Sequence, residues 1–370
     1  MAMNKRWESY VMYRQKSGLV DFWNEFYKDK KHPHVLFLLG KGFDPRMNNI
    51  LKLFLSTVSD AHLECIAFDF PIAGADAETQ KLYNLNVEEL NKIQKEYGFP
   101  MESIKIDTTL KWDKSIAMMS RQIGDKDLSQ YNDVILDVSS LPRAFYFNIA
   151  KVLFKKLKDD KSKNLFFAVS ENVGVDNGIE KTHQTDNIDA LRGFKSMLSV
   201  EAILDRVNIL IPLIGENGVE LLNSIYTDFK PHDMFPVLPF PSKNPRRSDD
   251  LLQEYHDFFE EKRFLEPQSI TYADEQNPFE LYRIVSNMMR EHKRTLQPIS
   301  KNVCFGIALL TSKLLSLGGL LLGLEHNNSV AIYNVSSTNY TIKDAAELVK
   351  LNSDSEPFLL WITGEAYNEN

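Results

Sequence analysis

The sequence predicts an α/β fold made of Rossmann-like parallel sheet units with helices on both faces, arranged as two halves. Three apolar runs support this prediction, because each stops abruptly in a polar or glycine-containing turn: 34–46, 134–143 and 303–313. Short apolar runs of this kind are typical of strands that are buried on both faces of a parallel sheet. In open α/β sheets the turns that follow such strands line the ligand crevice, so all three turns are candidate ligand sites.

The first half is expected to follow a short helical segment. Residues 1–30 are predicted to form an N-terminal helical clamp, since aromatic and aliphatic residues recur on one side of a helix over 4–30. Pro33 ends that pattern, and strand and helix patterns then alternate. The predicted strands begin at 34 and cover 63–70, 103–106, 133–138 and 164–169, and the predicted helices cover 47–59, 77–97, 115–123 and 144–158.

Residues 171–193 contain few apolar side chains, which predicts a long loop and a boundary between the halves. The predicted domains are therefore 1–30, 31–193 and 194–370. Both halves begin with an apolar strand and a glycine turn, at Gly40–Gly42 and Gly215–Gly218, which indicates a duplicated architecture. In the second half the predicted strands are 207–213, the run from 303, 330–335 and 358–362. Residues 234–240 are a strand or an extended piece, because their prolines argue against a central strand, and 269–273 form a further segment. The predicted helices are 218–229, 249–261, 278–293, the leucine-rich segment after 313, and 343–351.

The charge and cysteine content exclude several classes of protein. The chain carries 43 basic and 51 acidic side chains, a formal net charge of −8. This net negative charge argues against broad binding to nucleic acid, although the chain could still contain a local basic site. Cys65 and Cys304 each lie in an apolar run, so we expect neither a disulfide nor a thiolate metal site. The N-terminus has no apolar signal region, and a cytoplasmic location is the prediction.

The run from Val303 to Leu324 holds a single charge, Lys313, and could be read as a membrane span. Thr311, Ser312 and Lys313 fall in the middle of the run, and three glycines follow. These residues favour a strand, a turn and a helix packed on a sheet, so we predict no membrane segment.

The first candidate ligand-binding turn contains Gly40, Lys41, Gly42, Asp44 and Arg46. Its glycines would let a ligand approach the backbone, the next helix would offer free N–H groups, and the two cations would bind phosphate. The pattern is neither a complete dinucleotide-binding fingerprint nor a P-loop. The alternative is a tight turn in which Asp44 caps a helix.

The second candidate turn, Asp137 to Arg143, carries two hydroxyls and a guanidinium at the end of a strand. Ser139 and Ser140 can donate to phosphate oxygens and Arg143 can bind them in bidentate fashion, with Asp137 orienting the arginine or a ribose hydroxyl. In the alternative interpretation, Ser140 is a helix N-cap and Arg143 a surface charge. No motif of a serine hydrolase surrounds these serines.

Three further features are weaker candidates. Thr311, Ser312 and Lys313 open a helix much as the second turn does, so both turns could share one anionic ligand across a cleft; the alternative is helix capping with an extended lysine. Asp69, at the end of the second strand, could meet a ribose. The cationic loop 241–247 is either a solvated turn or a contact surface.

At these residues the chain resembles the CARF-type, Rossmann-like nucleotide sensors of prokaryotic defence systems. Gly40 to Arg46 would match the first-strand loop of that family, and Asp137 to Arg143 or Thr311 to Lys313 its later strand-turn-helix segment. The resemblance implies a Rossmann-like fold over residues 34–363, a homodimer and a cyclic oligonucleotide as ligand.

The leading hypothesis is a cytosolic regulatory or sensor protein that binds a nucleotide or another phosphate-bearing small molecule, in a prokaryotic antiviral defence system. A second hypothesis is a hydrolase or transferase acting on a nucleotide-derived substrate, with Asp44, Asp69 or Asp137 as acid, base or orienter. A third is a non-catalytic subunit that contacts a protein partner. No catalytic residue or metal ligand is predicted, and a nucleotide is the one ligand that we expect.

Overall fold

The computed structural model of the chain describes residues 5–71, 75–107, 110–183, 189–196, 206–262, 267–300, 302–334 and 337–367. It divides into two compact units. The seven-stranded unit contains residues 11–182 and 337–370, and the six-stranded unit contains residues 1–10 and 183–336. Both are α/β, with sheets in which parallel pairs predominate, as the sequence predicts.

The division differs from the predicted domains 1–30, 31–193 and 194–370. The C-terminal strand β15 (Glu356–Thr363) returns to the first sheet, where it pairs antiparallel with β6 (Asn164–Glu171). Apolar periodicity shows that a strand is buried but not which sheet buries it.

The seven-stranded sheet has a doubly wound core. Its strand order is β1-β15-β6-β5-β2-β3-β4, and β2 through β6 are all parallel to one another. Since β2 is the first of these five along the chain, the order in that core is 3-2-1-4-5. The strands not yet given are β1 (Val11–Arg14), β2 (His34–Lys41), β3 (His62–Asp69), β4 (Met101–Lys105) and β5 (Asp133–Asp137).

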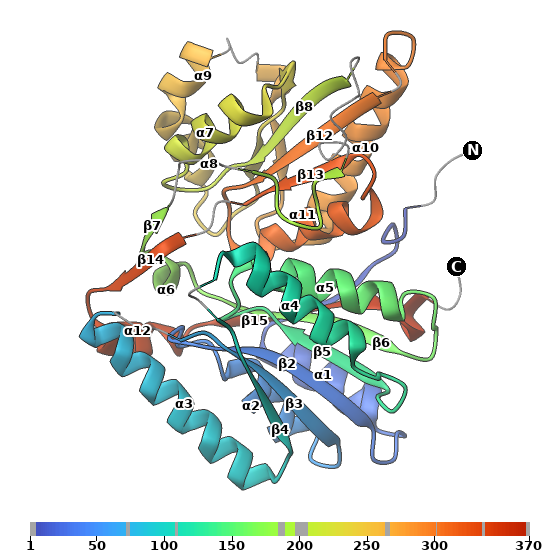
Figure 1. The fold of residues 1–370 in the computed structure, drawn as a ribbon, viewed down its shortest axis with the longest axis vertical. Helices are drawn as coiled ribbons and strands as arrows, with labels where there is room; N and C mark the ends of the chain where they lie inside the picture. Colours follow the sequence, from blue (N-terminus) through green and yellow to red (C-terminus); the bar gives the residue numbers. More distant parts are fainter. Residues whose placement is uncertain are drawn as a thin grey trace. The chain divides into compact units, whose positions relative to one another are not determined.

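Helices cover both faces of this sheet (Figure 1). Val35, Phe37 and Leu39 of β2 pack against the side chains of α1 and α2, and the residues between them point to the opposite face, as expected for a strand buried on both sides. The helices of the unit are α1 (Lys16–Tyr27), α2 (Asn49–Thr57), α3 (Ala77–Tyr97), α4 (Trp112–Asp125), α5 (Arg143–Leu157), α6 (Val173–Asn177) and α12 (Ala345–Asn352).

The helix predicted over residues 4–30 is wrong in its first part. Residues 11–14 form β1, Gln15 adopts a left-handed φ of 64°, and α1 starts only at Lys16. Trp7 and Tyr10 instead pack in the six-stranded unit, against Tyr282 and Phe279 respectively. The aromatic residues that predicted a single helical clamp therefore pack in the cores of two different units.

The six-stranded unit repeats the same strand order. Its main path is β11-β10-β8-β12-β13, with β9 beside β8, so its five main strands also run 3-2-1-4-5 from the first, β8. This confirms the predicted duplication at the level of topology. The elements are β8 (Arg206–Leu213), α7 (Val219–Phe229), β9 (Asp233–Met234), β10 (Val237–Pro239), α8 (Arg247–Glu254), α9 (His256–Lys262), β11 (Thr271–Ala273), α10 (Pro278–Leu296), β12 (Asn302–Leu309), α11 (Lys313–Glu325) and β13 (Val330–Tyr333).

The apolar run from Val303 to Leu324 divides between β12 and α11, as predicted. A Cβ on Gly318 of α11 would lie 2.5 Å from Leu281, so the glycine allows close packing against α10. Among the described residues, no helix is long and apolar enough to span a membrane.

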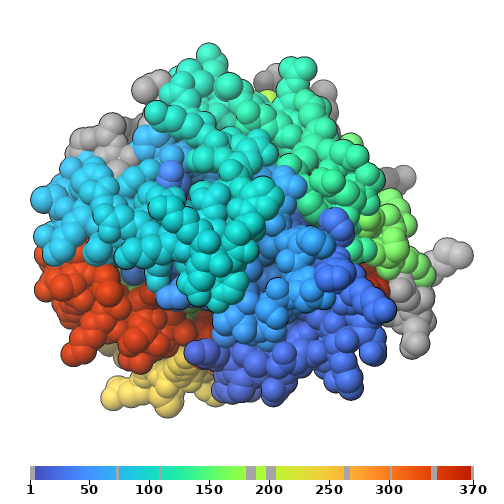
Figure 2. Space-filling view, turned by 90° about the horizontal axis from the view of Figure 1, so that it is seen from below, coloured from blue at the N-terminus to red at the C-terminus, as the bar shows by residue number. Residues whose placement is uncertain are grey.

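The loop predicted over 171–193 contains regular structure. Helix α6 is followed by β7 (Ile179–His183), which pairs with β14 (Ser337–Ile342) in a separate two-stranded ribbon. The chain passes between the units at the ends of these two strands, 182–183 and 336–337. Figure 2 shows the residues after β14, in orange-red, beside the light-blue α3, and Ala345 N donates to Glu78 Oε2 at 3.0 Å.

Candidate functional site

Two of the predicted turns meet at one edge of the seven-stranded sheet. The strands β2 and β5 are neighbours, so the turns that follow them lie side by side at their carboxyl ends. Ser140 Oγ donates to the Gly40 carbonyl oxygen at 2.6 Å. This is also the place where the connections diverge, toward β3 on one side and β6 on the other. Such a switch point is where open α/β sheets bind ligands.

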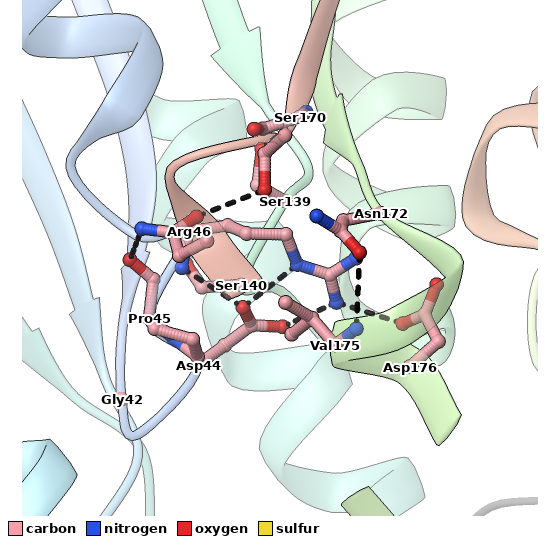
Figure 3. Close-up of polar contacts among 12 residues, drawn as sticks. Gly42, Asp44, Pro45, Arg46, Ser139, Ser140, Ser170, Asn172, Val175 and Asp176 are labelled. Carbon is pink, nitrogen blue, oxygen red and sulfur yellow. Dashed lines mark hydrogen bonds and ion pairs between the residues drawn. The ribbon is translucent and has the colours of Figure 1, made fainter. Parts of the chain in front are cut away.

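Arg46 is buried within the first turn (Figure 3). Its Nε and Nη2 donate to the two carboxylate oxygens of Asp44 at 2.9 and 2.8 Å, and Nη2 also donates to Asp176 Oδ1 at 2.8 Å. Burial alone lowers the pKa of the Arg46 guanidinium, but the two carboxylates outweigh it and raise that pKa. With 1% of the residue exposed, Arg46 binds protein carboxylates where a phosphate had been expected.

The side chains of the second turn also form hydrogen bonds within the protein. Ser139 is fully buried; its Oγ donates to Asp137 Oδ1 at 2.5 Å and accepts from Ser170 N at 2.8 Å. These bonds join the ends of β5 and β6. Arg143 is the first residue of α5 and is partly exposed. The hydroxyls predicted to hold phosphate thus hold the turn together.

Amide side chains fix the backbone of the first turn. Asn86 Nδ2 donates to the carbonyl oxygens of Gly42 and Asp44, both at 2.9 Å. Asn352 Nδ2 donates to the Pro45 carbonyl at 2.7 Å. A turn held at three of its carbonyl groups keeps one conformation, which favours it as a preorganised binding surface.

Besides Arg143, the partly exposed polar groups at this edge include Lys41, Asp69 and Tyr83. Lys41 Nζ donates to Asp69 Oδ2 at 3.1 Å, and Tyr83 Oη donates to Asp69 Oδ1 at 2.7 Å. Lys41 and Asp69 keep 18% and 17% of their side chains exposed. Burial and the Asp69 charge raise the pKa of the Tyr83 hydroxyl, so that it remains a donor at neutral pH.

A small aromatic cavity adjoins Asp69. The rings of Phe70 and Trp112 each contact Phe145, with centroids 4.9 and 5.1 Å away. The cavity has room for about one water molecule, so a larger group could enter only after lining side chains moved. It is lined by Phe70, Ile106, Asp107, Leu110, Trp112, Ser115 and Phe145.

The surroundings of the two glycines in the first turn differ. A Cβ on Gly40 would lie 2.9 Å from Leu141 Cδ2, so this glycine serves the packing of the two turns. A Cβ on Gly42 would meet nothing within 4 Å. A Cβ would therefore fit at Gly42 but not at Gly40, although the Gly42 residue itself is buried.

The third predicted turn lies in the other unit. Ser312 is the N-cap of α11, with Oγ accepting from Leu315 N at 3.1 Å, which confirms the capping interpretation. Thr311 is buried, and Lys313 begins the helix. A single ligand shared between this turn and the second one stays a prediction.

Sequence reasoning identified Lys41, Gly42 and Asp69 but not Tyr83 or the aromatic lining. Tyr83 belongs to α3, and nothing in its local sequence pattern separates it from other partly exposed helical residues. Phe70 directly follows β3, where an aromatic residue after a strand end is the available signal, and Trp112 is the first residue of α4. Within the described ranges, no group of three or more His, Cys, Asp or Glu side chains could hold a metal ion.

Comparison with known proteins does not identify a family. No protein-family model matches the chain, and no curated protein sequence matches it. A protein assigned to the universal stress proteins of Pseudomonas aeruginosa UCBPP-PA14 is 10% identical, with 87% of this chain and 98% of that chain covered and a TM-score of 0.23. A methyltransferase dependent on S-adenosylmethionine, from Clostridium acetobutylicum, is 11% identical, covers 46% and 57%, and has a TM-score of 0.23.

An NH3-dependent NAD synthetase from Campylobacter jejuni is 12% identical, with 85% and 91% of the two chains covered and a TM-score of 0.21. Scores this low establish no structural relationship. The proposals that follow therefore rest on the residues of this chain.

Proposed function

We propose that the seven-stranded unit binds a nucleotide at the carboxyl end of β2 and β3. The observation that carries this proposal is the group of Lys41, Asp69 and Tyr83 at the switch point of a 3-2-1-4-5 sheet. An acidic residue at the end of the second strand binds ribose hydroxyls in many such sheets. Lys41 would turn from Asp69 toward a phosphate and form a charge-assisted hydrogen bond with it.

The base of the nucleotide would bind in the aromatic cavity. Phe70 directly follows Asp69, so a base that extends from a ribose held by Asp69 would reach Phe70 and Trp112. Aromatic rings favour flat apolar groups. Opening of this cavity is part of the proposed binding event, because its present volume excludes a base.

The contacts of the first turn support a regulatory role. Phe43 contacts Tyr340 of β14, with ring centroids 5.2 Å apart. Arg46 binds Asp176 of α6, the helix before β7, and the Pro45 carbonyl binds Asn352 of α12, the helix after β14. A ligand bound at the turn would therefore be linked by direct contacts to the helices and strands through which the chain leaves and re-enters the unit. This is the kind of coupling that a sensor needs.

Calorimetric titration of the full chain tests the proposal, with AMP, ATP, NAD and cyclic tetra-adenylate as probes. The last probe represents the cyclic oligonucleotide class of the CARF-type sensors. We expect at least one to bind, and Lys41→Ala and Asp69→Asn each to weaken that binding about tenfold or more, because each loses a charge-assisted contact. The control is Lys52→Ala, which removes an exposed lysine paired with Glu89 in the same unit.

The same samples distinguish a sensor from an enzyme. After overnight incubation, chromatography should recover the bound probe unchanged. A new product that forms with wild type, and not with Asp69→Asn, would instead support the hydrolase or transferase. Failure of all four probes to bind would contradict nucleotide binding.

A further inference from the structure

The six-stranded unit exposes an aromatic pair at the carboxyl end of β10 and β11. Phe240 and Tyr272 are 52% and 45% exposed, and their ring centroids lie 6.0 Å apart at an interplanar angle of 74°. Phe240 N donates to the Ala273 carbonyl at 2.8 Å, so both rings stand on paired strands. Large exposed aromatic rings held in this way commonly mark binding surfaces.

The loop after Phe240 is held in one conformation by hydrogen bonds. Glu275 N donates to the Pro241 carbonyl at 3.0 Å, and Lys243 N donates to Glu275 Oε2 at 2.9 Å. Arg246 N donates to Asn244 Oδ1 at 3.1 Å. The loop therefore presents its side chains from a fixed backbone.

Arg247 anchors the end of this loop. Its Nε and Nη2 donate to the two carboxylate oxygens of Glu216, each at 2.7 Å, and its Nη1 donates to Glu275. Burial lowers the pKa of the Arg247 guanidinium, but Glu216 and Glu275 outweigh it and raise that pKa. Arg247 is buried, and the two carboxylates balance its charge. It therefore supports the loop.

Unlike Arg247, the two other cations of the loop, Lys243 and Arg246, are exposed. The Arg246 guanidinium has no hydrogen-bond or ion-pair partner among the residues that the structure describes. A protein with a net charge of −8 thus presents two exposed cations on a rigid loop that begins at the aromatic pair.

We propose that this surface binds a single-stranded nucleic acid segment, with bases stacked on Phe240 and Tyr272 and phosphates bound by Lys243 and Arg246. Stacking on exposed aromatic rings beside cations is how proteins bind single strands without reading their sequence. A free mononucleotide would need a concave site to bury its surface, and rings half exposed on a strand end suit a strand that bridges several contacts. Asp249 and Asp250, in the first turn of α8, limit how many phosphates can be held.

Fluorescence anisotropy with labelled (dT)10 and (rU)10 tests the proposal on the full chain. We expect Phe240→Ala and Tyr272→Ala each to weaken binding fivefold or more, since each removes a ring on which a base would stack. Arg246→Ala should weaken binding and reduce the salt slope by about one. The matched controls lie in the other unit: Tyr97→Ala removes an exposed ring and Arg121→Ala an exposed cation.

Three results would overturn the assignment. One is the absence of measurable binding at low salt. The second is binding that Phe240→Ala and Tyr272→Ala change by less than twofold, which would leave only charge attraction. The third is competition by AMP that equals competition by unlabelled (dT)10 at the same phosphate concentration, which would make the ligand a free nucleotide. Heparin, a polyanion without bases, should compete far less well than (dT)10.

Discussion

Arg46 Nη2 donates to Asp176 Oδ1 at 2.8 Å and thereby joins the first turn of the seven-stranded sheet to α6. The two residues are 130 positions apart in the chain. Asp44 holds the same guanidinium in bidentate geometry. The arginine expected to bind a ligand anion thus binds two protein carboxylates. The charged side chains that stay partly exposed nearby are those of Lys41 and Asp69.

Removing either carboxylate should destabilise the seven-stranded unit, but to different extents. Asp44→Asn leaves the buried guanidinium with Asp176 as its one carboxylate partner and should cost about 3–5 kcal/mol. Asp176→Asn should cost about 1–2 kcal/mol, since that side chain is 25% exposed. Lys52→Ala, at an exposed pair, should cost under about 1 kcal/mol.

Urea unfolding followed by tryptophan fluorescence measures these changes. Three of the four tryptophans, at 23, 112 and 361, belong to the seven-stranded unit. Equal losses for the Asp44 and Asp176 variants would contradict the assigned geometry.

The Arg46–Asp176 contact should carry the ligand signal to the ribbon of β7 and β14. With ATP bound, we expect hydrogen exchange in residues 179–182 to change by at least twofold in wild type. Asp176→Ala should retain ATP binding within threefold and lose most of that change, because the contact between the turn and α6 is gone. Loss of ATP binding together with the signal would place Asp176 in the ligand site itself.

The two glycines of the first turn should respond differently to alanine. Gly40→Ala forces a Cβ to within 3.0 Å of Leu141 and Ser140 and should cost about 1–3 kcal/mol. Gly42→Ala meets no atom within 4 Å and should leave stability within about 0.5 kcal/mol. If the ligand occupies that open side, the Gly42 variant should bind ATP at least tenfold more weakly.

Urea unfolding and calorimetry of both glycine variants check this contrast. Normal ATP binding by Gly42→Ala would mean that the ligand does not approach the turn from its open side.

The six-stranded unit should lose stability in mild acid. Burial lowers the pKa of His326, Glu325 partly offsets this, and Lys293 and Lys5 add to it; Ser286 Oγ lies 3.2 Å from Nε2. The unfolded chain then binds more protons, so stability is full above the unfolded pKa of about 6.5 and falls as the pH drops through it toward the lower folded pKa. His326→Gln should flatten this dependence.

The urea midpoint of α10 and α11, from pulsed hydrogen exchange with labelling at one fixed pH, measures this effect between pH 7.5 and 5.5. An unchanged pH dependence in His326→Gln would assign the effect to other groups.

Much of the fold could be predicted from local patterns. The range 77–97 is α3 as observed, because Asp76 caps it through Thr79 N and Gly98 ends it in a left-handed conformation. The apolar runs that form β2, β5 and β12 could be recognised as strands equally well, because strands buried on both faces have little alternation of polar and apolar residues. What escaped prediction was connectivity: that β15 returns to the first sheet and that β1 joins it there.

The site was predictable in position more than in detail. Lys41, Gly42 and Asp69 could be found because they lie at the carboxyl ends of the apolar runs that form β2 and β3, where parallel sheets bind ligands. That Arg46 and Ser139 are turned inward depends on Asp176 and Ser170, which are distant in sequence. No spacing rule indicates such a partner, because it exists only once β6 and α6 have been placed.

A crystal structure of the full chain with ATP, at a concentration that saturates the calorimetric titration, tests nucleotide binding most directly. We expect density for the ribose within hydrogen-bond distance of Asp69, a phosphate at Lys41 beside Gly42, and Trp112 or Leu110 displaced by the base. A nucleotide bound elsewhere, with the Lys41–Asp69 pair intact at about its present 3.1 Å, would contradict the proposed site.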